Sequence, residues 1–307
     1  MPSAASYLRP DVIAQVQRLD LRARFIVEGF MSGMHSSPYH GSSVEFSEHR
    51  KYVPGDDLRL IDWSLLARTD RYYIRKYEAE TNMQCHLIVD TSVSMAYPEP
   101  AQLRGTGRMS KLDYAICLAA ALGYLMVQQQ DAVGLACFDT QLRNFLPARS
   151  KKSHLMRLLG ELARVRPQRD EQEKGLAVAI HEVANRVHKR GLMIVLSDFL
   201  APREPVIKAL HHLRFHGHDV ILFQVLDWSE VEFPFEQLTR FEDPETKRIL
   251  TTNPLAIRES YLRALRDFTE EYKHDAAAVR SDFVQVHTAM TFDRALTEFL
   301  VNRRRRG

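Results

Sequence analysis

The sequence contains little cysteine. Its three cysteines, Cys85, Cys117 and Cys137, fit neither a zinc-binding nor a redox spacing. Two of them lie inside apolar runs, where a free thiol behaves as a small hydrophobic side chain. This cysteine usage is typical of a protein in a reducing compartment.

Long hydrophobic runs are also missing. The first six residues do not combine a basic region with a following apolar one, so we expect no signal peptide. The most apolar stretches, 87–89 and 192–196, are too short to cross a bilayer. The sequence therefore predicts a soluble, cytoplasmic protein without a membrane span.

Several catalytic motifs are absent. There is no Gly-x-x-x-x-Gly-Lys-Ser/Thr loop, which argues against a P-loop ATPase, and no Gly-x-Ser-x-Gly elbow. His181 and Glu182 are adjacent, but Asn185 stands where a zinc protease has its second histidine. The formal net charge of +3 is too small to indicate nucleic-acid binding.

Short apolar strands alternate with helices from residue 86 onward. We expect strands at 86–89, 132–138, 192–196, 219–226 and 283–287, and helices at 112–129, 154–165, 176–189, 204–215, 255–272 and 292–301. This alternation predicts an α/β fold, a doubly wound and mostly parallel sheet with helices on both faces.

Three regions are expected along the chain. Residues 1–80 form an N-terminal extension, with a helix at 10–30, a Gly/Ser-rich loop at 32–43 and a charged, aromatic segment that includes short strands. Residues 81–290 form the α/β domain. Residues 291–307 form a C-terminal helix and a basic tail.

An unusual loop follows the strand at 86–89. It reads Asp90-Thr91-Ser92-Val93-Ser94, and the strand at 192–196 ends in Ser197-Asp198. Because parallel strands end at the same edge of a sheet, Asp90 and Asp198 are expected to lie on one edge, where α/β proteins bind ligands. Carboxylate and hydroxyl oxygens suit a hard cation such as Mg²⁺ or Mn²⁺.

This loop resembles the metal-ion-dependent adhesion site of von Willebrand factor A domains. The resemblance implies that Ser92 and Ser94 contact the metal directly, that Asp90 and Asp198 act through water, and that a partner carboxylate fills an open position. The family pattern also has a threonine where this sequence has Lys174. A charged lysine cannot ligate a cation, but it can neutralise the two acids and replace the metal.

A simpler interpretation of the same loop is also open. Asp90 and Ser92 would then cap the helix near Lys111, or satisfy amide groups of the loop, without any ligand.

A second signature lies upstream. Its residues are Glu45-Phe46, Arg50, Tyr52, Pro54-Gly55-Asp56-Asp57, Arg59, Ile61-Asp62-Trp63 and Ala67-Arg68-Thr69. Together with residues 90–95, it resembles the bacterial domain-of-unknown-function family numbered fifty-eight, over about residues 32–226. That resemblance implies a von Willebrand A-like fold and a MoxR-type AAA+ ATPase as partner.

The charged side chains of this signature have two possible uses. Arginine pairs with carboxylates through two parallel hydrogen bonds, so Arg50, Arg59 and Arg68 with Asp56, Asp57, Asp62 and Trp63 can fix the extension to the domain. Arginine and tryptophan are also favoured anchors of protein interfaces, so the segment can be a docking surface.

Three functions remain open from the sequence. The favoured one is a non-enzymatic adaptor whose sheet edge, with Asp90, Ser92, Ser94 and Asp198, binds a partner during assembly or remodelling of other proteins. The others are a metal-dependent hydrolase that uses Asp90 and Asp198, and a purely structural assembly subunit.

Overall fold

The chain divides into two compact units. The computed structural model describes residues 17, 19–24, 26–27, 49–51, 68, 71–75, 84–103, 108–167 and 175–297. One unit comprises residues 1–33 and 83–307, and the other comprises residues 34–82. In the smaller unit, β1 (His49–Lys51) pairs antiparallel with β2 (Tyr73–Arg75), and Arg50 stands opposite Ile74.

The larger unit is built on a sheet that has six strands in the described part of the chain. They are β3 (Gln84–Asp90), β4 (Ala132–Phe138), β5 (Leu142–Arg149), β6 (Gly191–Ser197), β7 (Asp219–Leu226) and β10 (Asp282–His287). Their order is β10-β7-β6-β3-β4-β5, and every neighbouring pair is parallel except β4 with β5. The predicted fold class, a doubly wound and mostly parallel α/β sheet, is confirmed.

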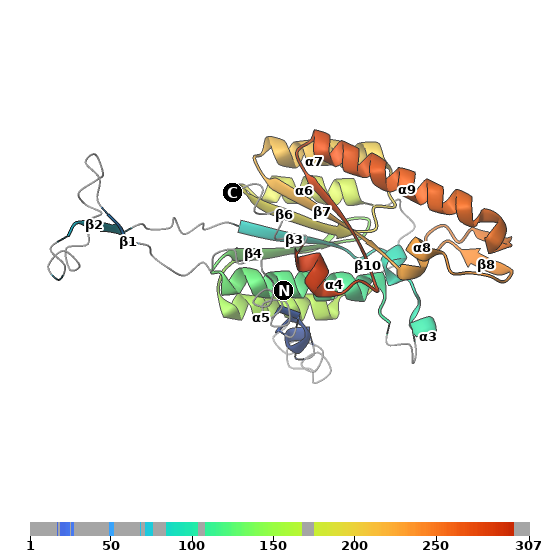
Figure 1. The fold of residues 1–307 in the computed structure, drawn as a ribbon, viewed down its shortest axis with the longest axis horizontal. Coiled ribbons are helices and arrows are strands. Elements are labelled where there is room, and N and C mark those ends of the chain that lie inside the picture. The colour runs from blue at the N-terminus through green and yellow to red at the C-terminus, as the bar shows by residue number, and fades with distance from the viewer. Residues whose placement is uncertain are drawn as a thin grey trace. The chain divides into compact units, whose positions relative to one another are not determined.

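Helices cover both faces of this sheet (Figure 1). One face carries α4 (Lys111–Gln128) and α5 (Lys152–Arg164). The other carries α6 (Leu176–Arg186), α7 (Arg203–Phe215) and α9 (Pro254–Ala278). Shorter helices, η3 (Val93–Ala96), α3 (Pro100–Leu103) and α8 (Trp228–Glu232), follow strands or lie in connections, and residues 292–297 are helical.

The central strands are buried along almost their whole length. Every residue of β6 is buried, and so is every residue of β3 after Gln84. Continuous apolar runs of this kind are typical of parallel strands that have helices on both sides. Ile88 and Val195 pack with Ile180 of α6 and Leu210 of α7 in one core cluster.

Helix α4 is the most apolar helix of the described chain. By length and composition alone it is long enough to cross a membrane, but 72% of its 18-residue window is buried inside the fold. Burial of this extent is typical of a core helix. The side chain of Ser110 caps its first turn by accepting a hydrogen bond from the Asp113 N–H.

Helical residues near the N-terminus belong to the same unit. Leu19, Ala23 and Val27 recur at intervals of four residues and are all buried. The guanidinium of Arg24 lies 5.8 Å from the ring centroid of Tyr124 on α4.

One antiparallel hairpin was not expected from the sequence. Strands β8 (Thr239–Glu242) and β9 (Ile249–Thr252) pair between α8 and α9, a region for which the sequence analysis gives no element. Asp243 forms the turn between them, because its carboxylate accepts hydrogen bonds from Glu245 N–H and Thr246 O–H.

The order of the strands reverses beside β3. The chain proceeds from β3 to β4 and β5 on one side, and then places β6, β7 and β10 on the other. The carboxyl ends of β3 and β6 therefore form the topological switch point, where open α/β sheets bind their ligands.

A buried histidine in β3 predicts sensitivity to acid. His86 is buried beside Gly134, and burial, with His218 nearby, lowers its pKa from 6.5 to about 4. The neutral ring stabilises the fold above pH 6.5, and this stability is lost as the pH falls towards 4. Between pH 7 and pH 4, we expect the free energy of unfolding of His86→Met to fall by on the order of 3 kcal/mol less than that of the parent protein. Urea unfolding at the two pH values measures this difference.

The matched control is the exposed His188. We expect His188→Gln to lose the same free energy of unfolding between pH 7 and pH 4 as the parent protein. An identical pH dependence of His86→Met and the parent would contradict the assignment to His86.

Candidate functional site

Four parallel strands bring polar side chains to one edge of the sheet. Asp90 ends β3, Ser197 ends β6 and is followed by Asp198, Asp227 follows β7, and Thr288 follows β10. Val89 is in register with Leu196, so Asp90 and Ser197 are level across the switch point. The Ser197 hydroxyl donates a hydrogen bond of 2.5 Å to Asp90 Oδ2, which ties the two strand ends together.

The loop after β3 is held by its own polar groups. Asp90 Oδ1 accepts a hydrogen bond of 2.9 Å from the Ser92 N–H, and the Ser92 and Ser94 hydroxyl oxygens lie 3.1 Å apart. The Thr91 N–H and O–H both donate to the Phe138 carbonyl at the end of β4. Asp90 therefore satisfies an amide of its loop, whereas the cap of α4 is Ser110 and not Asp90 or Ser92.

A lysine pairs with the acid that follows β6. Lys111 Nζ lies 3.1 Å from Asp198 Oδ2 and 3.0 Å from Glu230 Oε1 of α8. The Lys111 side chain is 1% exposed and that of Asp198 is not exposed. The second oxygen of Asp198 accepts a hydrogen bond from the Leu200 N–H. Three elements distant in sequence thus meet at one ammonium group.

The charge of Lys111 is kept in spite of its burial. Desolvation opposes the charged form, but Asp198 and Glu230 outweigh it and raise the pKa of Lys111 above its ordinary value. A lysine that stays charged donates hydrogen bonds and accepts none, so it cannot ligate a metal.

These residues do not fit a divalent cation shared between the two strands. Asp198, the acid from the second strand, is already neutralised at 3.1 Å by Lys111. Among the residues that the structure describes, no group of three His, Cys, Asp or Glu side chains is placed to hold a metal ion.

A second buried acid organises the end of β7. Asp227 is fully buried and caps α8 through the Ser229 N–H, and it also accepts hydrogen bonds from the Ser229 and Thr288 hydroxyls. Burial raises the pKa of Asp227, but these hydrogen bonds and Arg108 outweigh it, and the pKa lies below the ordinary value. The Asp227 N–H in turn donates to Glu230. Glu230 therefore links the Asp227 cap to Lys111.

Two side chains reach the surface from this buried network. Arg108 donates a hydrogen bond of 2.7 Å to Asp227, and its guanidinium lies 5.7 Å from the ring centroid of Trp228. The side chain of Arg108 is 39% exposed, and Trp228 is 36% exposed. A cation and an aromatic ring are thus presented directly above the buried acids.

The β8–β9 hairpin lies beside α8 at the same end of the sheet (Figure 1). Its inner face packs through Phe241 on Phe233, which contacts Tyr261 of α9 with ring centroids 4.6 Å apart. Burial, with the charge of Glu230, raises the pKa of Tyr261 to about 12, and the charge of Lys111 acts against this rise.

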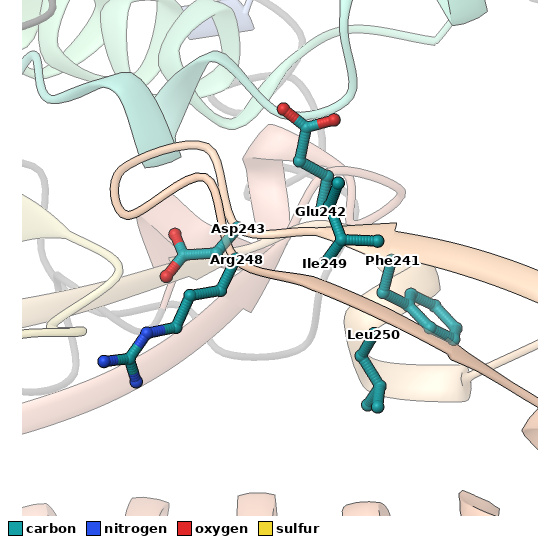
Figure 2. Close-up of a pocket in the computed structure, with 6 residues that line it drawn as sticks. All are labelled: Phe241, Glu242, Asp243, Arg248, Ile249 and Leu250. Carbon is teal, nitrogen blue, oxygen red and sulfur yellow. The ribbon is translucent and has the colours of Figure 1, made fainter.

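The hairpin carries an open hollow, lined by Phe241, Glu242, Asp243, Arg248, Ile249 and Leu250. Figure 2 shows Phe241 and Leu250 pointing to one side of the two strands, with Glu242 and Ile249 on the other. Ile249 and Leu250 are both more than half exposed. The hairpin therefore offers apolar side chains to the solvent.

The structure brings the predicted acids and hydroxyls of the domain to one edge. Asp90, Ser92, Ser94 and Asp198 are all buried there. Lys174 lies outside the described residues, and the neutralising contact with Asp198 that was expected from it is made by Lys111. Gly175, the next residue, precedes α6 at its predicted start, and a Cβ there would lie 1.9 Å from the Thr140 carbonyl oxygen.

The upstream signature is described only in part. Asp56, Asp57, Arg59, Asp62 and Trp63 lie outside the described residues. Of the other two, Arg50 lies in β1 and Arg68 is an exposed helical residue of the smaller unit.

Sequence reasoning missed Asp227, Lys111 and Glu230. Asp227 follows a buried strand just as Asp90 does, so the same argument would have found it. Lys111 gives no comparable signal, because a lysine in the first turn of a helix is usually a solvated residue.

Comparisons with known sequences identify relatives of this chain. The family described as "Protein of unknown function DUF58" matches residues 48–271. Uncharacterized proteins of Mycobacterium tuberculosis and Mycobacterium bovis are 28% identical over 301 residues, which cover 96% of this chain and 91% of each relative. The family resemblance expected from the sequence is confirmed.

Solved structures show the same architecture. The conserved hypothetical protein BatB from Bacteroides thetaiotaomicron and an aerotolerance-related membrane protein from Bacteroides fragilis each have a TM-score of 0.50 at 16% identity. In both cases the match covers 73% of this chain and 99% of the solved one. At this level of identity the likeness establishes the fold alone.

The Asp227 cluster predicts a stability contribution. We expect Asp227→Asn to lower the free energy of unfolding at pH 7 by about 2–3 kcal/mol, because the charged acceptor of Arg108, Ser229 and Thr288 is lost. Because the pKa of Asp227 is lowered in the fold, this difference is present above the ordinary carboxyl pKa and shrinks as the pH falls below it. Urea unfolding at several pH values measures both effects.

Glu259→Gln is the matched control, since Glu259 is exposed on α9 and pairs with the exposed Arg263. Equal unfolding free energies for Asp227→Asn and the parent protein at pH 7 would contradict the prediction.

Proposed function

The chain belongs to the DUF58 family of proteins of unknown function, and we propose that it is a non-enzymatic, protein-binding adaptor. Its partner docks at the carboxyl edge of the sheet. The observation that supports this proposal is a group of exposed side chains beside the edge, which we call the edge surface. It comprises Arg108, Trp228, Leu238, Leu250 and Leu255.

The composition of the edge surface is that of a protein interface. Tryptophan and arginine are the side chains that most often carry binding energy, and Trp228 lies against Arg108. Leu238 is 75% exposed and Leu255 is 58% exposed. Apolar side chains exposed together on a folded protein mark a surface that another molecule covers.

The buried network gives this surface a fixed base. Arg108 is held by Asp227, and Trp228 opens α8, whose first turn is locked by the Asp227 and Glu230 capping box. Anchors that are already positioned lose little conformational entropy when they bind. Asp90, Ser92, Ser94 and Asp198 act in this proposal by shaping the edge, because all four are buried.

The partner that we propose is a MoxR-type AAA+ ATPase of the cytoplasm, which follows from the family resemblance. In this proposal the ATPase supplies the energy of hydrolysis, and the edge surface directs it to a protein complex that is being assembled or remodelled.

Binding to the MoxR-type ATPase of the same organism tests the proposal. With both proteins purified, we expect Trp228→Ala to weaken the complex by at least about tenfold and the double change of Trp228 to alanine and Leu250 to serine to weaken it further. Calorimetry or surface plasmon resonance measures the affinity, and circular dichroism checks that each variant is folded.

Phe215→Ala provides a matched control. Phe215 is 88% exposed and ends α7, at the opposite edge of the sheet. Its replacement is expected to leave the affinity unchanged. If the edge-surface variants bind as tightly as the parent protein, or if Phe215→Ala weakens binding equally, the proposed docking surface is wrong.

A further inference from the structure

The switch point between β3 and β6 is a place where a positive charge is required. Asp90 and Asp198 lie at the ends of adjacent buried strands. Lys111 contacts both Asp198 and Glu230, so a third carboxylate lies at the same edge. Several buried carboxylates at one edge repel one another unless a cation lies among them. In an adhesion-type site that cation is a divalent metal ion.

In this chain a side chain supplies the cation. Lys111 stands at the first position of α4, and its ammonium group bridges Asp198 Oδ2 and Glu230 Oε1 at 3.1 and 3.0 Å. The lysine is 1% exposed, so water does not screen its charge. We propose that the Lys111 ammonium takes the place of the divalent cation at this edge, and that the site is complete without a metal ion.

The first acid of the edge has hydrogen-bond donors of its own. Asp90 accepts hydrogen bonds from the Ser92 N–H and the Ser197 hydroxyl. Its charge is therefore stabilised by donors of the loop and of β6, while Lys111 neutralises the second acid, Asp198.

A metal ion at this place would be repelled by the lysine. To be held by Asp198, directly or through one water, a divalent ion must come within a few ångströms of an ammonium group that is buried. Repulsion between these charges is strong where the local dielectric is low. The ion and the charged lysine therefore exclude each other.

Titration of Mn²⁺ into the purified full chain tests the proposal directly. Calorimetry or the paramagnetic resonance of free Mn²⁺ is expected to show no saturable site at millimolar concentration, and Mg²⁺ is expected to leave the Tm unchanged. A saturable site in the parent protein that is lost in Asp90→Ala would overturn the proposal.

Removal of the ammonium group tests the exchange of one cation for the other. We expect Lys111→Met, which keeps the apolar length of the side chain, to bind Mn²⁺ at least about tenfold more tightly than the parent and to gain Tm with Mn²⁺, reversibly with EDTA. Lys111→Arg keeps the charge and is expected to stay indifferent to Mn²⁺. Lys208→Met, which removes an exposed lysine of α7, is the matched control and is expected to show no gain.

A second variant provides for the case in which Lys111→Met does not fold. The double change Lys111→Met with Glu230→Gln removes one charge of each sign and leaves Asp90 and Asp198 at the switch point. It is expected to gain the same Mn²⁺ site. A folded variant that lacks Lys111 and gains no Mn²⁺ affinity would show that the lysine does not stand in for the ion.

One consequence rests on the proposed adaptor function. Binding of the partner ATPase at the edge surface is expected to be the same in EDTA as in Mg²⁺, provided that no nucleotide is present. A complex that forms in Mg²⁺ and is lost in EDTA would overturn the lysine proposal and leave the adaptor function standing. Absence of a complex under both conditions would overturn the adaptor function, while the Mn²⁺ titrations of the isolated chain still decide the role of Lys111.

Discussion

The carboxyl edge of the sheet depends on one buried positive charge. Lys111 joins the start of α4 to the end of β6 and to α8, which are separated by 87 and 119 residues in the chain. Without this charge, Asp198 would lose its ion pair in the interior, at a cost of about 3–5 kcal/mol. Glu230 would lose the contact that orients it towards the Asp227 cap, so α8 and the hairpin that packs on it depend on the same ammonium group.

The edge therefore combines a buried polar layer with an exposed apolar one. Inside, the carboxylates of Asp90, Asp198 and Asp227 are each held by hydroxyl, amide or cationic donors. Outside, Trp228 and the β8–β9 hairpin present side chains that water solvates poorly. The inner layer supplies rigidity and the outer layer supplies contact area, which is the division of roles expected of a surface that binds a protein.

The sequence predicted which strand ends meet at this edge, but not which side chains contact one another there. Asp90 and Asp198 could be placed together because parallel strands end on the same side and a buried strand is recognised by its apolar run. Lys111 could not be assigned to Asp198, because that contact depends on how α4 starts relative to β6, which no local pattern records. The β8–β9 hairpin was missed because its strands are only four residues long and largely exposed, so alternation of apolar and polar residues is weak there.

The strand at the far side of the sheet limits how copies of this chain can associate. β5 is antiparallel to β4, its pairing is interrupted by register shifts, and its residues Arg143, Pro147 and Arg149 are exposed. Proline lacks the N–H that a further strand would need, and a bulge twists the margin away from a flat template. A second sheet is therefore hindered from extending this one by strand addition along β5, and oligomers that grow laterally from that margin are disfavoured.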